Sequence, residues 1–203
     1  QRSARYRDAF GSRFDPRDSM LGGELGLTHE VQPGATVWAR IARGYKAGGF
    51  NTSLAGIDFD EFPDFNLDAG NIEFAPEYLW DYELGLRLAP ATANWSMALN
   101  VFMQQRDDPQ IKVPAQLRLG DPTTYVFVTD IASDAATRGV ELEASWQLLP
   151  TLSLGTALGL LHTEIGDFNL RPELEGGDLA HAPRYTFALN ASWRSPQGWF
   201  ARA

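Results

Sequence analysis

Hydrophobic and polar residues alternate with a period of two along several stretches of this chain, which is the pattern of β-strands with one apolar and one polar face. In the stretch 79–88, for example, Leu84 and Leu86 alternate with Gly85 and Arg87. We assign no faces to residues 43–49, the Gly-rich end of the stretch 36–49, because a bulge is expected there. The alternation predicts eight strands, at 20–31, 36–49, 77–89, 94–106, 125–148, 152–162, 183–194 and 199–203.

The connections between the predicted strands differ in length on the two sides of the sheet. Short turns begin at Gln32, Pro90, Leu149 and Ser195, whereas the connections on the other side are long, at 50–76, 106–125 and 163–182. This asymmetry is typical of outer-membrane barrels, which have short periplasmic turns and long extracellular loops. It predicts an all-β fold, an antiparallel meander from a transmembrane β-barrel, with the long loops facing outside. A soluble β-sandwich with one face packed in a core is the competing interpretation of each strand taken alone.

The two faces of the predicted strands have different chemistry. Aromatic residues recur near strand ends, as in the interfacial girdles of membrane barrels, and they are Tyr45, Trp80, Trp95, Trp146, Trp193 and Trp199. We therefore expect the apolar face to contact lipid and the charged face to line the lumen. The residues that define the apolar face are Leu84, Leu86, Leu142 and Leu154, and those of the charged face are Glu83, Arg87, Glu141 and Glu143.

Composition narrows the classes of protein and partner. No uninterrupted apolar run of about 18 residues is present, which excludes a membrane-spanning helix. The formal net charge is −9, and the sequence has no basic cluster that could follow a phosphate backbone. A nucleic-acid partner is therefore not expected. Cysteine is absent, which removes disulfides, thiolate catalysis and cysteine-based zinc sites.

Six stretches match, in order, the sequence of one known family. The first, 39–51, reads ARIARGYKAGGFN and keeps an Arg-Gly-Tyr-Lys and a Gly-Gly-Phe-Asn block. The others are FAPE at 74–77 with YELG at 82–85, LNVF at 99–102, RGVELE at 138–143, GLL at 159–161 and APRYTF at 182–187. On these blocks, most of the chain after Met20 resembles the TonB-dependent outer-membrane receptors.

The resemblance implies a fold and a function. Receptors of this family have a barrel of about 22 strands around a plug domain. They import a scarce nutrient, most often a ferric siderophore and sometimes haem, cobalamin or a glycan, with energy from the TonB complex. The chain is thus expected to be a transporter segment in the cell outer membrane, in contact with lipid, and not an enzyme.

We expect residues 1–203 to form part of such a barrel domain, without its plug. Gln1–Phe14 is polar and has no apolar signal segment. Eight strands would span only part of such a barrel, and the last strand is too short to pair along the whole first strand. An open sheet is therefore predicted, with no pairing between the strands at 20–31 and 199–203. The alternatives are a complete eight-stranded barrel with a structural or adhesion role and an outer-membrane hydrolase, although no Gly-x-Ser-x-Gly motif is present.

The candidate ligand-binding residues are basic and aromatic side chains at loop entries or in the longest loop. Guanidinium groups and ring faces suit the oxygens of an anionic ferric chelate. Strand-anchoring at the membrane interface is the alternative role of the residues at strand ends. The candidates are Arg43, Tyr45 and Lys46, then Phe59, Phe62 and Phe65, and then Arg184 and Tyr185.

No catalytic group, cofactor or metal site is predicted. His162 and His181 flank the third long loop with Glu164, Asp167 and Asp178 nearby, but their spacing matches no metal motif. The acidic residues of the loop 50–76 lack the spacing of a calcium loop, and they are Asp58, Asp60, Glu61, Asp64 and Asp68.

Overall fold

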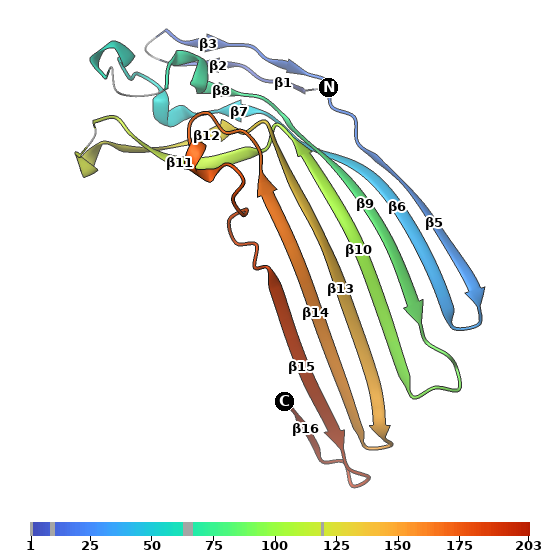
Figure 1. Ribbon diagram of the computed structural model, residues 1–203. Coiled ribbons are helices and arrows are strands. Elements are labelled where there is room, and N and C mark those ends of the chain that lie inside the picture. Colours follow the sequence, from blue (N-terminus) through green and yellow to red (C-terminus); the bar gives the residue numbers. More distant parts are fainter. Residues whose placement is uncertain (1, 9–10, 63–66, 119) are drawn as a thin grey trace.

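Eight strands form one antiparallel sheet, in the order β16-β15-β14-β13-β10-β9-β6-β5 (Figure 1). The computed structural model describes residues 1–203 except 1, 9–10, 63–66 and 119. The strands of this sheet are β5 (Gly23–Gln32), β6 (Ala35–Lys46), β9 (Glu77–Leu88), β10 (Trp95–Asp107), β13 (Asp134–Leu149), β14 (Leu152–Ile165), β15 (Tyr185–Arg194) and β16 (Phe200–Arg202). The predicted antiparallel meander is confirmed.

The sheet is open. β5 and β16 lie at its two opposite edges, and no ladder joins them in the described parts of the chain. The prediction of an open sheet is confirmed, and a complete eight-stranded barrel is not what the structure shows. The strand β6 also pairs with β9 without a register shift as far as Lys46, so the expected bulge at the end of this strand is absent from the paired residues.

One predicted strand is wrong in its extent. The stretch 125–148 forms two strands in different sheets, β12 (Tyr125–Ile131) and β13, which are separated by Ala132 and Ser133. β12 pairs with β11 (Gln110–Gln116), so the predicted loop 106–125 contains a strand of its own. The alternation of β11 is short and contains Pro114, which tolerates only an edge or hairpin position.

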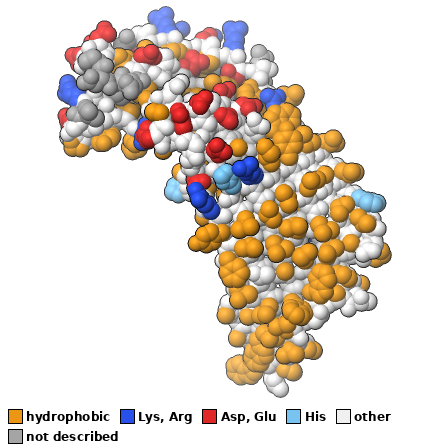
Figure 2. Space-filling view, viewed as in Figure 1, with side chains coloured by type: hydrophobic (Ala, Val, Ile, Leu, Met, Phe, Trp, Pro, Cys, Tyr) orange, Lys and Arg blue, Asp and Glu red, His pale blue; other side chains and the backbone are white. Residues whose placement is uncertain are grey.

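The register places the leucines of neighbouring strands on one face. Leu86, Leu99, Leu142 and Leu158 are successive Cα partners across four strands. We call this apolar side of the sheet the outward face; Leu84 on it is 64% exposed. Figure 2 shows hydrophobic side chains covering the long strands, while nearly all charged atoms visible from this side lie at or above the upper end of the sheet.

The opposite side, which we call the inner face, is polar and hollow. A cavity of about 860 Å³ spans it, and its lining includes Thr28, Trp38, Arg87, Glu143 and Asn190 from five different strands. Trp38 lies flat over β9, and a Cβ atom added at Gly85 would be 1.9 Å from its ring. The predicted separation of a leucine face and a charged face is confirmed by these registers.

Aromatic side chains stand at both ends of the outward face. Trp95 is the Cα partner of Trp146, and Trp193 is the partner of Leu152, all beside the short turns. Trp80 lies at the other end of the sheet. The apolar band between these two aromatic rows is the part of the sheet that fits a bilayer.

A second structural unit, which we call the cap, lies at the end of the sheet opposite the short turns (Figure 1). The cap consists of β1 (Arg2–Ser3), β2 (Tyr6–Arg7), β3 (Arg13–Phe14), β4 (Arg17–Asp18), β7 (Gly49–Phe50), η1 (Thr52–Leu54), η2 (Phe59–Glu61), η3 (Ala69–Ile72), β8 (Glu73–Phe74), β11, η4 (Pro122–Thr124), β12 and η5 (Pro172–Leu174).

No helix in the described residues is long and apolar enough to cross a membrane.

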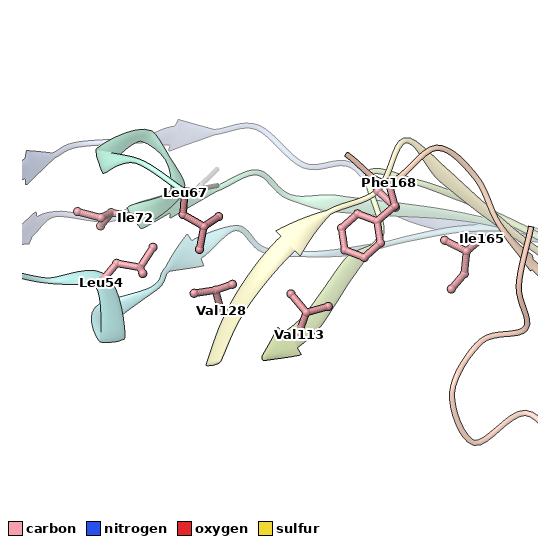
Figure 3. Packing of buried hydrophobic residues seen from close by; sticks show 8 residues of the cluster. Leu54, Leu67, Ile72, Val113, Val128, Ile165 and Phe168 are labelled. Atoms are coloured by element: carbon pink, nitrogen blue, oxygen red, sulfur yellow. The ribbon is translucent and has the colours of Figure 1, made fainter. Parts of the chain in front are cut away.

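The cap has its own hydrophobic core, to which all three long loops contribute. Val113 and Val128 face each other across the β11–β12 hairpin, and Phe168 comes from the loop after β14 (Figure 3). The buried members are Leu54, Leu67, Ile72, Val113, Val128, Ala132, Ile165 and Phe168. The long loops therefore fold together into one packed unit.

Candidate functional site: the inner face and the cap

A charged network crosses the upper part of the inner face. Arg40 Nη2 donates hydrogen bonds to Asp81 Oδ2 and to Glu83 Oε1, both at 2.6 Å. Arg40 Nη1 lies 3.4 Å from Glu24 Oε2, and Gln104 Nε2 donates to Asp81 Oδ1 at 3.0 Å. The register produces this arrangement, because Arg40 is the Cα partner of Glu83. One guanidinium thus serves three carboxylates, and this part of the wall has a net negative charge.

A second polar cluster fixes the junction between the sheet and the cap. The backbone N–H of Gln110 donates to Glu77 Oε2 at 3.0 Å, and Arg106 Nη1 lies 3.6 Å from Glu77 Oε1. The Gln110 side chain donates to the carbonyl oxygens of Ala47 and Ala75, at 3.0 and 2.9 Å. Glu77 is only 8% exposed. The hairpin β11–β12 is therefore tied to the ends of β6 and β9.

Asn51 joins the first long loop to the same hairpin. Its Nδ2 donates to the carbonyl oxygens of Asn71 and Thr129, at 2.8 and 2.7 Å. Its Oδ1 accepts from the backbone N–H of Thr129 at 2.7 Å. Asn51 is buried, so these three bonds satisfy an amide that water does not reach.

The surface of the hairpin that faces away from the cap core combines cations and aromatic rings. Lys112 Nζ lies 5.7 Å from the centroid of the Phe127 ring, and Phe127 is 59% exposed. Tyr125 is exposed on the same side of β12, and Arg118 lies over the ring of Phe62 at 5.1 Å. Exposed cations beside ring faces can bind an anionic or aromatic ligand.

The predicted site residues at the end of β6 fall on different faces. Arg43 and Tyr45 share the outward face with Ile41, whereas alternation places Lys46 on the inner side. The Arg43 guanidinium lies 4.7 Å from the Tyr78 ring centroid and 5.6 Å from that of Trp80. This stacking belongs to the upper aromatic row. The ligand-binding role of these three residues stays a prediction.

The predicted phenylalanines belong to the cap. Phe59 and Phe62 are half-buried and pack against its hydrophobic core. Phe65 lies outside the described residues. The loop 50–76 is thus partly folded around its aromatic residues, which the sequence pattern does not reveal because the partners of these rings come from other loops.

Of the last two predicted residues, Arg184 lies just before β15 and Tyr185 is the first residue of this strand. Arg184 Nε donates to Asp178 Oδ2 at 3.0 Å. Tyr185 is the Cα partner of Leu160 and is exposed on the outward face. The structure therefore does not bring all the predicted residues into one site. The sequence analysis did not single out three residues of the candidate site, which are Arg40, Asp81 and Lys112. For Arg40 and Asp81 the sequence held a signal, because each is a charged residue on the polar face of its strand, β6 or β9.

Titration of three cap carboxyl groups is shifted by their surroundings. Partial burial raises the pKa of Asp130 on β12. The hydroxyl and backbone N–H of Thr123 donate to Asp121 and lower its pKa. The side chain of Arg171 donates to Glu173 and lowers its pKa in the same way.

Metal ligation finds no geometric support in the described part of the chain. His162 Nε2 lies 4.0 Å from Glu164 Oε2, but no group of three His, Asp or Glu side chains among the described residues is arranged to hold an ion.

The sequence and the fold both match proteins of known class. The family model of the TonB dependent receptor-like β-barrel matches residues 3–203. Pesticin receptors of Yersinia enterocolitica and Yersinia pestis are 28% identical over 177 residues, which is 87% of this chain and 23% of theirs. The chain thus spans about a quarter of the length of these relatives.

Solved structures share the fold. The ferric yersiniabactin uptake receptor FyuA from Yersinia pestis superposes with a TM-score of 0.68 at 23% identity, over 95% of this chain and 26% of that one. The siderophore receptor PirA from Pseudomonas aeruginosa gives a TM-score of 0.57 at 17% identity, over 95% of this chain and 30% of that one. The copper transporter OprC gives a TM-score of 0.60 at 16% identity, over 86% of this chain and 24% of that one. Together with the family match, this confirms that the chain belongs to the β-barrel of the TonB-dependent receptors of the outer membrane.

Proposed function

We propose that the receptor containing this chain imports a ferric siderophore across the outer membrane with energy from the TonB complex. The observation that carries this proposal is the cap: its outer surface presents cations beside aromatic rings at the mouth of a polar wall. Lys112 with Phe127 and Arg118 with Phe62 are two such pairs. Ferric chelates with phenolate or carboxylate oxygens are anionic and often aromatic, so both features of this surface suit them.

Two solved structures of the same fold support this ligand class. FyuA is described as a ferric yersiniabactin uptake receptor and PirA as a siderophore receptor. Pesticin receptors match the chain in sequence. The outer-membrane hydrolase alternative is removed by the family, because TonB-dependent receptors are transporters. OprC, a copper transporter of the same fold, makes copper the second candidate cargo.

Uptake by the complete receptor tests the proposal. The full-length gene is expressed in an outer-membrane receptor-deficient strain, and cells under iron limitation are given radioactive iron bound to a catecholate, a phenolate or a hydroxamate siderophore. We expect receptor-dependent uptake of at least one chelate, and its loss in a strain without TonB. Copper uptake in place of iron uptake would assign the receptor to the second candidate. Absence of uptake of both metals would contradict the proposal.

A pair of cap variants tests which surface meets the chelate. The double variant Lys112→Ala and Phe127→Ala removes one cation and its ring from the exposed side of the hairpin. We expect weaker binding of the transported chelate, with normal heat-modifiable migration of the barrel. Arg13→Ala is the matched control, because Arg13 is an exposed cation on β3 in the same cap. Equal affinity of the double variant and the control would move the ligand surface elsewhere.

A further inference from the structure

The apolar runs of three outward-facing strand segments end, on the cap side, in a basic residue. On β13 the outward residues pass from Leu142 and Val140 to Arg138, and on β14 from Leu160 to His162. On β6 they pass from Ile41 to Arg43. In a barrel wall this level is where the hydrocarbon region gives way to lipid headgroups.

Arg138 and His162 form the densest part of this basic belt. They are direct Cα partners on neighbouring strands, with Met103 on the other side of Arg138. Both are exposed, and Arg138 has no hydrogen-bond or ion-pair partner among the described residues. Tyr185 stands exposed one strand further, beside Leu160. A guanidinium, an imidazole and a phenol thus face the membrane boundary together.

The surrounding acidic groups do not neutralise Arg138. Glu164 lies beside His162, with 4.0 Å between Oε2 and Nε2, and can pair with that imidazole. Asp107 and Asp134 are outward residues at the cap ends of β10 and β13 and are Cα partners of each other. Along β13, Asp134 is two outward positions closer to the cap than Arg138. An arginine at the headgroup level with no protein acceptor is complementary to a phosphate, which guanidinium binds through two parallel hydrogen bonds.

Arg43 repeats the arrangement three strands away. Its guanidinium is held between the Tyr78 and Trp80 rings, and its Nε is buried without an acceptor among the described residues. The stacking fixes the plane of the charged group at the same boundary. Two separate cationic points therefore lie along one rim of the outward face.

We propose that this rim binds the phosphate groups of anionic lipids in the outer leaflet, with Arg138, His162 and Tyr185 as one headgroup site and Arg43 on its aromatic platform as a second contact. The site is distinct from the ligand surface of the cap, since it is on the outward face, and it does not depend on the cargo of the receptor. The lipid stabilises the cap end of the barrel by supplying the acceptors that the protein lacks.

Lipid binding by the full-length receptor tests this site. The purified receptor is titrated with diphosphoryl lipid A and with enzymatically dephosphorylated lipid A in neutral detergent, and bound lipid is counted by native mass spectrometry. We expect the diphosphoryl form to bind and the dephosphorylated form to bind much more weakly. Inorganic phosphate in excess should not displace the lipid; displacement would assign the site to a free anion. Equal binding of the two lipid forms by the wild-type receptor would overturn the proposal without any variant.

Variants localise the site. Arg138→Gln is expected to weaken binding of diphosphoryl lipid A about fivefold, as one basic group at a headgroup surface does, and the double variant with His162→Gln to weaken it further. Arg87→Gln is the control, because Arg87 lies on the inner face. If Arg138→Gln reduces barrel assembly, Arg138→Lys keeps the charge and should bind lipid. Unchanged binding by the double variant would refute the assignment to these residues.

Discussion

Asn51 and Thr129 exchange two hydrogen bonds across the cap, each with a donor–acceptor distance of 2.7 Å. They join the first long loop to the β11–β12 hairpin, 78 residues further along the chain. Asn51→Ala would leave the Thr129 N–H and C=O without these partners. We expect the free energy of local opening at β12 to fall by about 1–3 kcal/mol.

Hydrogen exchange of the Thr129 amide in the full-length receptor measures this loss. Ser53→Ala serves as the control, since Ser53 Oγ makes a single exposed bond to the Phe127 carbonyl oxygen at 2.8 Å. Its effect should stay below about 1 kcal/mol. Equal exchange rates in the two variants would show that Asn51 does not hold the loops together.

The outward face should reject charge according to depth. Leu142 is the central outward residue of β13, between Trp146 and Arg138, whereas Leu154 is opposite Trp146 in the lower aromatic row. Leu142→Arg is expected to cost about 2–4 kcal/mol and Leu154→Arg only about 0–1 kcal/mol. Denaturant titration of the receptor folded into lipid vesicles gives both values. A tolerated Leu142→Arg together with a costly Glu143→Leu would reverse the assignment of the faces.

Arg40 should be the residue on which the inner-wall carboxylates depend. The Asp81 side chain is 5% exposed and has Arg40 as its charged partner, so Arg40→Ala leaves a buried carboxylate without a counter-charge. Because Arg40 itself is more exposed than Asp81, water screens part of the loss, and we expect about 1–3 kcal/mol of destabilisation. Arg40→Lys retains the charge without the planar guanidinium group, so its stability should lie between those of the wild type and Arg40→Ala. Denaturation of the three receptors in parallel gives the order.

The β11–β12 hairpin should lose stability as the pH rises through the range set by Asp130. Burial raises the pKa of this carboxyl above its ordinary value, so the folded cap retains a proton that the unfolded segment has released. The penalty therefore appears as the pH rises above the ordinary aspartate pKa, and it is complete once the pH exceeds the raised pKa of Asp130. Asp130→Asn should slow exchange of β12 amides above the raised pKa and have no effect below the ordinary aspartate pKa.

Asp121 provides the opposite sign in the same cap. Its pKa is lowered by the hydrogen bonds from Thr123, so its stabilising contribution is present above the ordinary aspartate pKa and disappears as the pH falls through the lowered value. Asp121→Ala should therefore speed exchange at η4 at neutral pH, with the difference vanishing in strong acid. Parallel pH profiles for the two variants would contradict the assigned causes.

The loop segment 58–66 should contribute to ligand capture. It carries Phe59 and Phe62, which pack against the cap core. Deleting it from the full-length receptor is expected to weaken chelate binding while heat-modifiable barrel assembly remains. Unchanged chelate affinity would exclude a role of this segment. Comparing the deletion with Asn51→Ala separates a lost contact from a loosened cap.

The sheet could be predicted from the sequence because each strand has one apolar and one polar face, and this asymmetry leaves a period of two. The leucine face followed from that period, the aromatic rows followed from the position of Trp and Tyr near strand ends, and the open sheet followed from the family resemblance, which implies a barrel of about 22 strands. The cap could not be predicted, because its strands are mostly two residues long and its core joins Leu54, Val113 and Phe168 from three loops. The Arg40 network depends on register, which alternation alone does not fix for residues on different strands.

The shared core of the cap limits how this receptor can be re-engineered. A single loop grafted from another receptor would bring only part of that core and would leave the remaining buried side chains without their counterparts. Changes of ligand preference by loop exchange should therefore succeed only when the three loops are transferred as a set, or when substitutions are confined to exposed positions such as Lys112 and Tyr125. Sequence drift in one loop should likewise be accompanied by compensating substitutions in the other two.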